Sequence, residues 1–280
     1  ALQRRLRNFR DLRFVSDQIL TQRFRSQGGA VLYEQSEPFV TDRAVESVAP
    51  GSVYPYANLP TGTAAIAAIQ KWGQKVFLSD EEIARNVYQG ASADRALRKV
   101  VNSIIKQVDG LAMSSIASAV TQTSAAAAAW NGGSAKFLQD VLLAKAVVVG
   151  LNLGYNPDTL ILNDTQYAYL MSDTTVQTGL KRETSDNPIY TGEMEILAGL
   201  RIIVSPAIGV AGAMVLDSTQ LGGMADEMDG AFGYAVSDLA VQVKSIRQEG
   251  TDGYDLQGRR KTVPVVQEPG AAVKITGTTI

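Results

Sequence analysis

The most regular hydrophobic pattern in the chain lies near its middle. From Asp94 to Val120, apolar residues recur in steps of three and four, the spacing that places side chains on one face of an α-helix. A helix of about 27 residues would be roughly 40 Å long at ~1.5 Å per residue. The pattern therefore predicts a long helix with one buried face.

Shorter helices are predicted around it from capping signals. Ser79 is followed three residues later by Glu82, which is the spacing of a capping box at the start of a helix. Ser134 precedes a second periodic stretch and predicts its cap. Asn163, with Gln166 at the box position, predicts a third short helix.

Short apolar runs bounded by turn residues predict strands over much of the remaining chain. These runs are Ala30–Tyr33, Thr159–Leu162, Arg201–Val204, Ala213–Leu216, Leu239–Ile246, Lys261–Val266 and Ala271–Ile275. Alternation around Lys71 to Leu78 predicts a two-stranded projecting ribbon, which needs another surface to lie on. Helices and strands are mixed without a regular βαβ alternation, so the predicted fold class is α+β.

Composition narrows the chemistry that the chain can perform. Its 280 residues are 45% hydrophobic and carry a formal net charge of −2, with no cysteine and no histidine. This composition excludes disulfides, thiolate nucleophiles and Cys/His zinc sites, and it removes the commonest general base. The longest uncharged stretch, from Gly110 to Ala135, is interrupted by polar residues, and no secretory signal is evident. We therefore expect a soluble protein made in the cytoplasm.

Few motifs suggest chemistry. Phosphate-binding, dinucleotide-binding and Gly-x-Ser-x-Gly motifs are absent from the sequence, and the formal Ser-x-x-Lys match at Ser103 lies inside the predicted long helix. The acidic cluster Asp226, Glu227 and Asp229 has ligand types that suit a divalent cation. Its spacing does not match a calcium loop, so a solvated turn is the preferred interpretation.

The N-terminus has an unusual charge distribution. Seven arginines fall in the first 25 residues against Asp11 and Asp17, with apolar residues at helical spacing among them. A basic amphipathic helix of this kind could bind nucleic acid or a membrane surface, dock on acidic surface of a neighbouring subunit, or remain solvated. Docking is preferred because interspersed apolar residues suit protein contact.

The segment from residue 28 to 78 has few large aliphatic residues to build a core. Aromatic residues on such a loop are either packed locally or act as interface anchors, and the weak core favours anchors. The predicted subunit-interface residues of the arm and this loop are Arg4, Arg5, Arg7, Phe9, Arg10, Arg13, Tyr54, Tyr56 and Leu59.

The order of these elements, together with several short stretches, resembles a known family. The stretches are Val48–Ser52, Gly154–Asn163, Val204–Pro206, Ala213–Asp217 and Val241–Arg247. In this order they resemble the major capsid proteins of tailed bacteriophages, which have the Hong Kong 97-type fold. The resemblance covers nearly the whole chain, and its weight lies in order and spacing.

The resemblance implies an architecture. It consists of an N-terminal arm (1–28), an extended loop (29–78), a peripheral domain with the spine helix (79–130), an axial domain (131–225) and returning strands of the peripheral domain (226–280). It also implies self-assembly of hexamers and pentamers into an icosahedral shell around double-stranded DNA, which is bound without sequence specificity. Scaffolding and portal proteins would be further partners, and a decoration protein is another candidate. The expected location is the virion capsid, assembled in the host cytoplasm, with no catalytic residue, cofactor, metal or membrane.

Two departures qualify what the resemblance implies. The covalent crosslink of the prototype uses a lysine in the extended loop, whereas no lysine occurs between Ala1 and Gln70, so we expect a non-covalent shell. There is also no room for an N-terminal scaffolding domain. A separate scaffold, a leader removed before Ala1 and simple loss of an initiator methionine remain open.

Two other functions compete with a phage shell. One is the shell of a cellular nanocompartment of the same fold (encapsulin-like), although no cargo-binding groove is identified in the sequence. The other is an α+β enzyme that works through carboxylates and lysine, for which the polar residues are scattered over turns.

Overall fold

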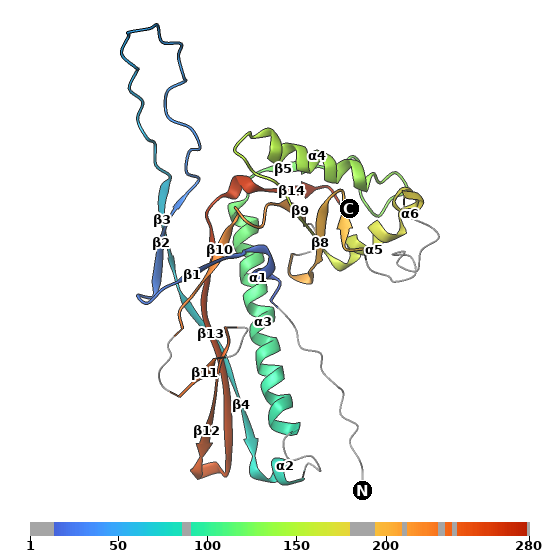
Figure 1. Ribbon diagram of the computed structural model, residues 1–280. Coiled ribbons are helices and arrows are strands. Elements are labelled where there is room, and N and C mark those ends of the chain that lie inside the picture. The colour runs from blue at the N-terminus through green and yellow to red at the C-terminus, as the bar shows by residue number, and fades with distance from the viewer. Residues whose placement is uncertain are drawn as a thin grey trace. The chain divides into compact units, whose positions relative to one another are not determined.

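The computed structural model describes residues 14–85, 91–179, 194–208, 212–228, 233–236 and 240–278. Its helices are α1 (Ser16–Ile19), α2 (Asp80–Arg85), α3 (Ala91–Ala119), α4 (Phe137–Gly150), α5 (Asp164–Ser172) and α6 (Thr174–Gly179). Its strands are β1 (Gln22–Arg25), β2 (Ala30–Gln35), β3 (Thr63–Ala68), β4 (Gln70–Ser79), β5 (Thr123–Ala125), β6 (Thr159–Leu162), β7 (Ile196–Leu197), β8 (Leu200–Val204), β9 (Ala213–Leu216), β10 (Gly222–Asp226), β11 (Ala235–Val236), β12 (Gln242–Gln248), β13 (Gly253–Val266) and β14 (Ala272–Thr276). This mixture, drawn in Figure 1, confirms the predicted α+β class.

The long helix α3 confirms the strongest periodicity in the sequence. Its buried positions recur every three or four residues, among them Val100, Ile104 and Val108. Gly258 of β13 lies directly against this face, because a Cβ built there would come within 2.8 Å of Val100 Cγ1. The glycine thus lets the helix approach the strand closely.

The chain separates into two compact units. The first contains residues up to Val31, Ala68–Ser114 and Met224–Pro264, and the second contains Leu32–Ala67, Ser115–Gly223 and Val265–Ile280. The family resemblance implies five consecutive segments instead of two units that are discontinuous in sequence, and its boundaries stay a prediction.

The first unit is built on a six-stranded sheet in the order β1-β10-β13-β12-β11, with β4 also paired to β13. The pairs β12–β13 and β13–β4 are antiparallel, and β4 runs along β13 from the Gly253–Ser79 pair to the Thr262–Gln70 pair. Strand β13 is 14 residues long, far longer than the Lys261–Val266 strand that the sequence predicted.

The second unit contains a six-stranded sheet in the order β5-β14-β9-β6-β8-β7. Strands β6 and β9 are buried at every position. Helix α4 packs on this sheet through Phe137, Val141, Ala144 and Val148, which share a core with β6, β9 and β14. This core holds α4 on the sheet.

The predicted ribbon exists, but its location in the prediction was wrong. Lys71–Leu78 belongs to β4 in the sheet of the first unit. The two-stranded ribbon is instead formed by β2 and β3. The alternation was read correctly as a strand, but alternation alone does not identify the partner of a strand.

Most capping predictions hold. Asn163 and Gln166 form the capping box of α5, and Ser79 Oγ accepts a hydrogen bond from Glu82 N at the start of α2. The predicted cap at Ser134 is wrong, because α4 begins at Phe137 after Lys136, which makes no side-chain cap. Helix α4 is held instead by its packing on the sheet.

Candidate functional site

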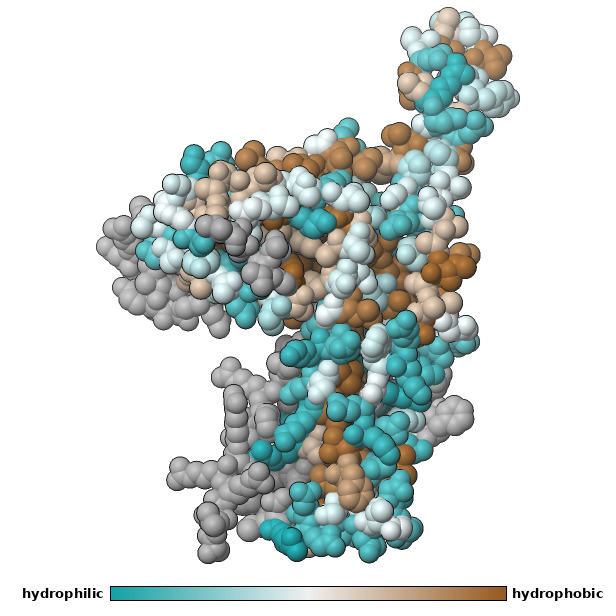
Figure 2. Space-filling model, turned by 180° about the vertical axis from the view of Figure 1, so that it is seen from behind, coloured by the Kyte–Doolittle hydropathy of each residue, from teal (hydrophilic) through white to brown (hydrophobic). Residues whose placement is uncertain are grey.

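The tip loop, residues 36–62, joins β2 to β3 in the second unit and is the most exposed apolar segment of the chain that the structure describes. Tyr54, Tyr56 and Leu59 are 79%, 92% and 85% exposed. The other large apolar side chains exposed in this loop are Phe39, Val40, Val45 and Val53. Figure 2 shows apolar residues in brown among polar ones at this loop. Aromatic side chains that find no cover within their own chain are typical anchors of protein interfaces.

The tip loop is nevertheless ordered by polar contacts of its own. Asp42 accepts hydrogen bonds from Asn58 N at 2.8 Å and from Asn58 Nδ2 at 2.7 Å. Arg43 contacts Glu46 at 2.9 Å. A turn follows in which Gly51 has φ +85°, a conformation that favours glycine.

The base of the tip loop is tied to the segment after β13. Ser36 N donates to Gln267 O at 2.9 Å, and Gln35 Nε2 donates to Val266 O at 3.1 Å. Gly62 lies so close to this end of β2 that a Cβ there would come within 2.9 Å of Gln35 O. The base of the loop is therefore attached to the segment after β13 at two points.

Glu268 extends this attachment. Its Oε1 accepts a hydrogen bond from Glu37 N at 3.3 Å, and its Oε2 accepts one from Tyr155 Oη at 2.9 Å. Burial raises the pKa of Tyr155, and the hydrogen bond and negative charge of Glu268 raise the pKa further. Tyr155 therefore stays protonated and acts as a donor at neutral pH.

A different kind of segment lies in the first unit: the strap, residues Phe14–Arg25. The Arg260 guanidinium is 0% exposed; it donates two hydrogen bonds of 3.0 and 3.1 Å to Asp226 and two of 3.0 and 3.4 Å to Asp17. The Phe14 ring stacks on the same guanidinium at 4.2 Å. Burial alone lowers the pKa of Arg260, but Asp226 and Asp17 outweigh it and raise the pKa.

The spine helix holds the strap at a second point. Asp109 of α3 is buried and accepts hydrogen bonds from Val15 N at 3.1 Å and Ser16 N at 2.9 Å. These backbone groups open α1 and have no partner within the helix. Asp109 therefore serves as a distant cap, supplied by an element far away in the sequence.

The predicted interface residues fall into two groups. Tyr54, Tyr56 and Leu59 lie together on the tip loop, as exposed as the interface interpretation requires. The predicted residues of the arm, Arg4, Arg5, Arg7, Phe9, Arg10 and Arg13, lie outside the described residues. The predicted interface role of both groups stays a prediction.

The acidic cluster near residue 226 differs from its predicted state. Asp226 lies in β10 and is buried against Arg260, and Glu227 contacts Lys261 at 3.2 Å. The solvated turn predicted for these two residues is therefore wrong, and Asp229 lies outside the described residues. No sequence motif marks this ion cluster, because Asp17, Asp226 and Arg260 are distant along the chain.

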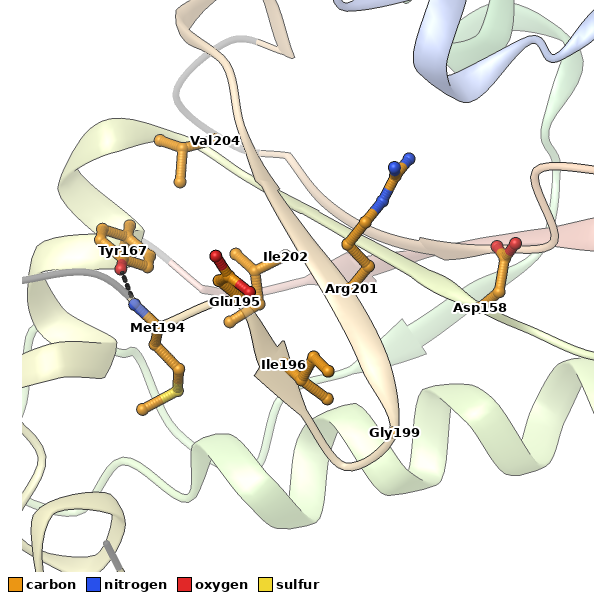
Figure 3. A pocket seen from close by; sticks show the side chains of 9 residues that line it. All are labelled: Asp158, Tyr167, Met194, Glu195, Ile196, Gly199, Arg201, Ile202 and Val204. Carbon is orange, nitrogen blue, oxygen red and sulfur yellow. Dashed lines mark hydrogen bonds between the residues drawn. The ribbon is translucent and has the colours of Figure 1, made fainter. Parts of the chain in front are cut away.

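A hollow of about 830 Å³ opens beside β7 and β8 in the second unit. Figure 3 shows its charged residues, Asp158, Glu195 and Arg201, at separate places around it, and Asp158 already accepts hydrogen bonds from Ser218. Tyr167 Oη accepts a hydrogen bond from Met194 N at 2.6 Å. Such scattered groups do not form a converging catalytic set.

Neither a membrane-spanning helix nor a metal-binding cluster occurs among the described residues. Within the described ranges, no helix is both long and apolar enough to cross a membrane. The same part of the chain contains no group of three acidic, histidine or cysteine residues arranged to hold a metal ion.

Comparison with solved structures identifies the fold. The chain is similar to the capsid protein of cyanophage P-SCSP1u, with 16% identity and a TM-score of 0.69 over 100% of this chain and 92% of the other. It is similar to the mature capsid of bacteriophage PhiM1, with 8% identity and a TM-score of 0.66 over 99% and 90%. It is also similar to a virus-like particle from Pyrococcus furiosus, with 15% identity and a TM-score of 0.59 over 95% and 92%. These likenesses support the predicted Hong Kong 97-type fold.

Comparison of sequences identifies the family. No curated protein matches the chain by sequence. The family model described as phage capsid protein matches residues 62–275, well over half of the chain. This family consists of structural proteins, so the enzyme considered from the sequence is set aside. The chain therefore belongs to the phage capsid protein family.

Proposed function

We propose that this chain is the major shell subunit of a tailed bacteriophage and assembles as hexamers and pentamers into an icosahedral shell around double-stranded DNA. The observation that carries the proposal is the tip loop, whose aromatic and aliphatic side chains have no cover in the isolated chain. Monomeric proteins rarely leave such a cluster exposed unless it binds something.

In this shell the tip loop of each subunit packs on a neighbouring subunit. Every subunit is then both a donor and a recipient of a loop, and a closed assembly multiplies contacts that are individually weak. Without a lysine between Ala1 and Gln70, the contact is non-covalent. The arginines of residues 1–13 are proposed to contact a neighbour as well.

A shell subunit of a tailed phage would have further partners besides its own copies. A scaffolding protein would guide closure, a portal protein would replace one pentamer, and a decoration protein is a candidate for the outer surface. Packaged DNA would be held without sequence specificity, and assembly would take place in the host cytoplasm.

A nanocompartment shell is the second candidate. The similarity to the Pyrococcus furiosus virus-like particle favours it, since the fold match covers 95% of this chain. The contents of the particle separate the two functions, because a phage shell packages long double-stranded DNA and a nanocompartment packages protein cargo.

The test is electron microscopy of particles formed by the complete chain, made alone and with its neighbouring phage genes. We expect icosahedral particles of megadalton size, with nuclease-protected DNA when the packaging genes are present. Replacing Tyr54 and Tyr56 by serine should abolish these particles, whereas Tyr254→Ser, on a strand of the first unit, should not. A chain that stays monomeric under all conditions would contradict the proposal.

A further inference from the structure

The tip loop contains one link that joins its two arms. Asp42 and Asn58 are 16 positions apart, and both carboxylate oxygens of Asp42 are used, one on Asn58 N and the other on Asn58 Nδ2. Two parallel bonds between the same residues fix their orientation as well as their distance. We call this pair the clamp.

The clamp encloses the exposed part of the loop. Val53, Tyr54 and Tyr56 lie between its two residues, and all three are mostly exposed. Because they are not buried, hydrophobic packing within the loop does little to restrict the conformations available to this stretch. The ion pair Arg43–Glu46 of the loop spans only three residues and cannot hold the two arms together.

Binding through a loop is weakened by the entropy lost when the loop becomes ordered. A link that orders the loop beforehand removes part of that loss and strengthens binding without touching the partner. We infer that Asp42 is a positioning residue for assembly, which holds the tip loop in the conformation that docks on a second copy of this chain.

The charge of the loop supports a protein surface as its partner. Residues 36–62 contain one arginine, Arg43, against the carboxylates Glu37, Asp42 and Glu46. Such a segment would be repelled by the phosphates of nucleic acid. A second copy is the partner that a shell of identical subunits places beside every loop, so the inference rests on the proposed function and adds a residue to it.

The experiment measures the protein concentration at which particles begin to form, by light scattering. Asp42→Ala should raise this threshold roughly tenfold, since it removes two hydrogen bonds to a charged group. Asn58→Ala should raise it less, because the backbone N–H remains. Asp94→Ala is the matched control, because it removes an exposed carboxylate of α3 outside the tip loop, and it should stay within about twofold of the wild type.

A second variant separates positioning from a general loss of structure. The chain contains no cysteine, so Asp42→Cys with Asn58→Cys offers a single disulfide in place of the clamp. The oxidised double variant should assemble near the wild-type threshold, and the reduced one should behave like Asp42→Ala. Thermal unfolding of the unassembled subunits should be the same for all variants.

The outcomes distinguish this inference from the proposed function. If wild-type particles form and Asp42→Ala assembles at the same concentration, the clamp does not position the loop and the inference is wrong. Equal thresholds for the oxidised and reduced double variant would also overturn it. If the wild type forms no particles at all, the proposed function fails together with this inference.

Discussion

The strap and the tip loop obtain their order in opposite ways. In the strap, Phe14, Ile19 and Leu20 are almost fully buried, and the charged residues around them are satisfied within the first unit. In the tip loop the large apolar side chains are exposed, and only polar contacts hold the backbone. The strap is thus covered by its own fold, whereas the apolar side chains of the tip loop have no cover within their own chain.

The largest effect on the free energy of unfolding is expected for Arg260→Met, which tests how the strap is held. The substitution takes the buried arginine away from Asp226, whereas Asp17 keeps its ion pair with Arg23. Removing one partner of a buried ion pair costs about 3–5 kcal/mol. We expect that loss in the free energy of unfolding of unassembled subunits, measured by denaturant titration. Arg23→Met, on a half-exposed arginine of the same cluster, should cost about 1 kcal/mol or less. Similar values for the two variants would show that the strap is not held by the buried pair.

A smaller effect is expected for Asp109→Ala. Val15 N and Ser16 N would lose their acceptor in a buried place, which costs about 1–3 kcal/mol. Trypsin should then cleave after Arg23 or Arg25 faster than in the wild type, because the strap opens more often. Asp94→Ala is the control, since that residue is exposed on the same helix and forms a surface ion pair with Arg98. An unchanged cleavage rate in Asp109→Ala would contradict the role of the distant cap.

The smallest effect on folding is expected for the tip loop. Replacing Tyr54 and Tyr56 by serine should change the free energy of unfolding of single subunits by less than about 0.5 kcal/mol, since neither side chain is buried. The same variant should fail to form particles, as described above. A clear loss of subunit stability would mean that these side chains pack within their own chain, and would end the contrast with the strap.

The sequence predicted well what depends on local pattern. The spacing of Val100, Ile104 and Val108 predicted α3, and the capping box at Asn163 predicted α5, because both signals arise from neighbours along the chain. The exposed aromatic pair on the tip loop was also found, since a segment with few aliphatic residues cannot bury Tyr54 or Tyr56.

Features that depend on distant partners were missed. Asp226 and Arg260 meet because β10 and β13 are paired, and Asp17 reaches them from α1, just before β1 of the same sheet. Nothing in the local sequence indicates that meeting. Strand β10 was not predicted, although it is buried throughout, because its sequence is rich in glycine and ends in Asp226. Likewise the clamp joins two ordinary polar residues in a loop, and only the fold of the loop brings Asp42 to Asn58.

The bare aromatic surface of the tip loop also bears on how cells must produce this protein. Until a newly made subunit finds its place, Tyr54 and Tyr56 can adhere to any apolar surface they meet, including partly folded chains. Assembly of subunits into a closed shell then competes with their precipitation. Which of the two prevails depends on how quickly assembly removes free subunits. Slow, cool expression should therefore yield more shells per chain synthesised than a rapid burst.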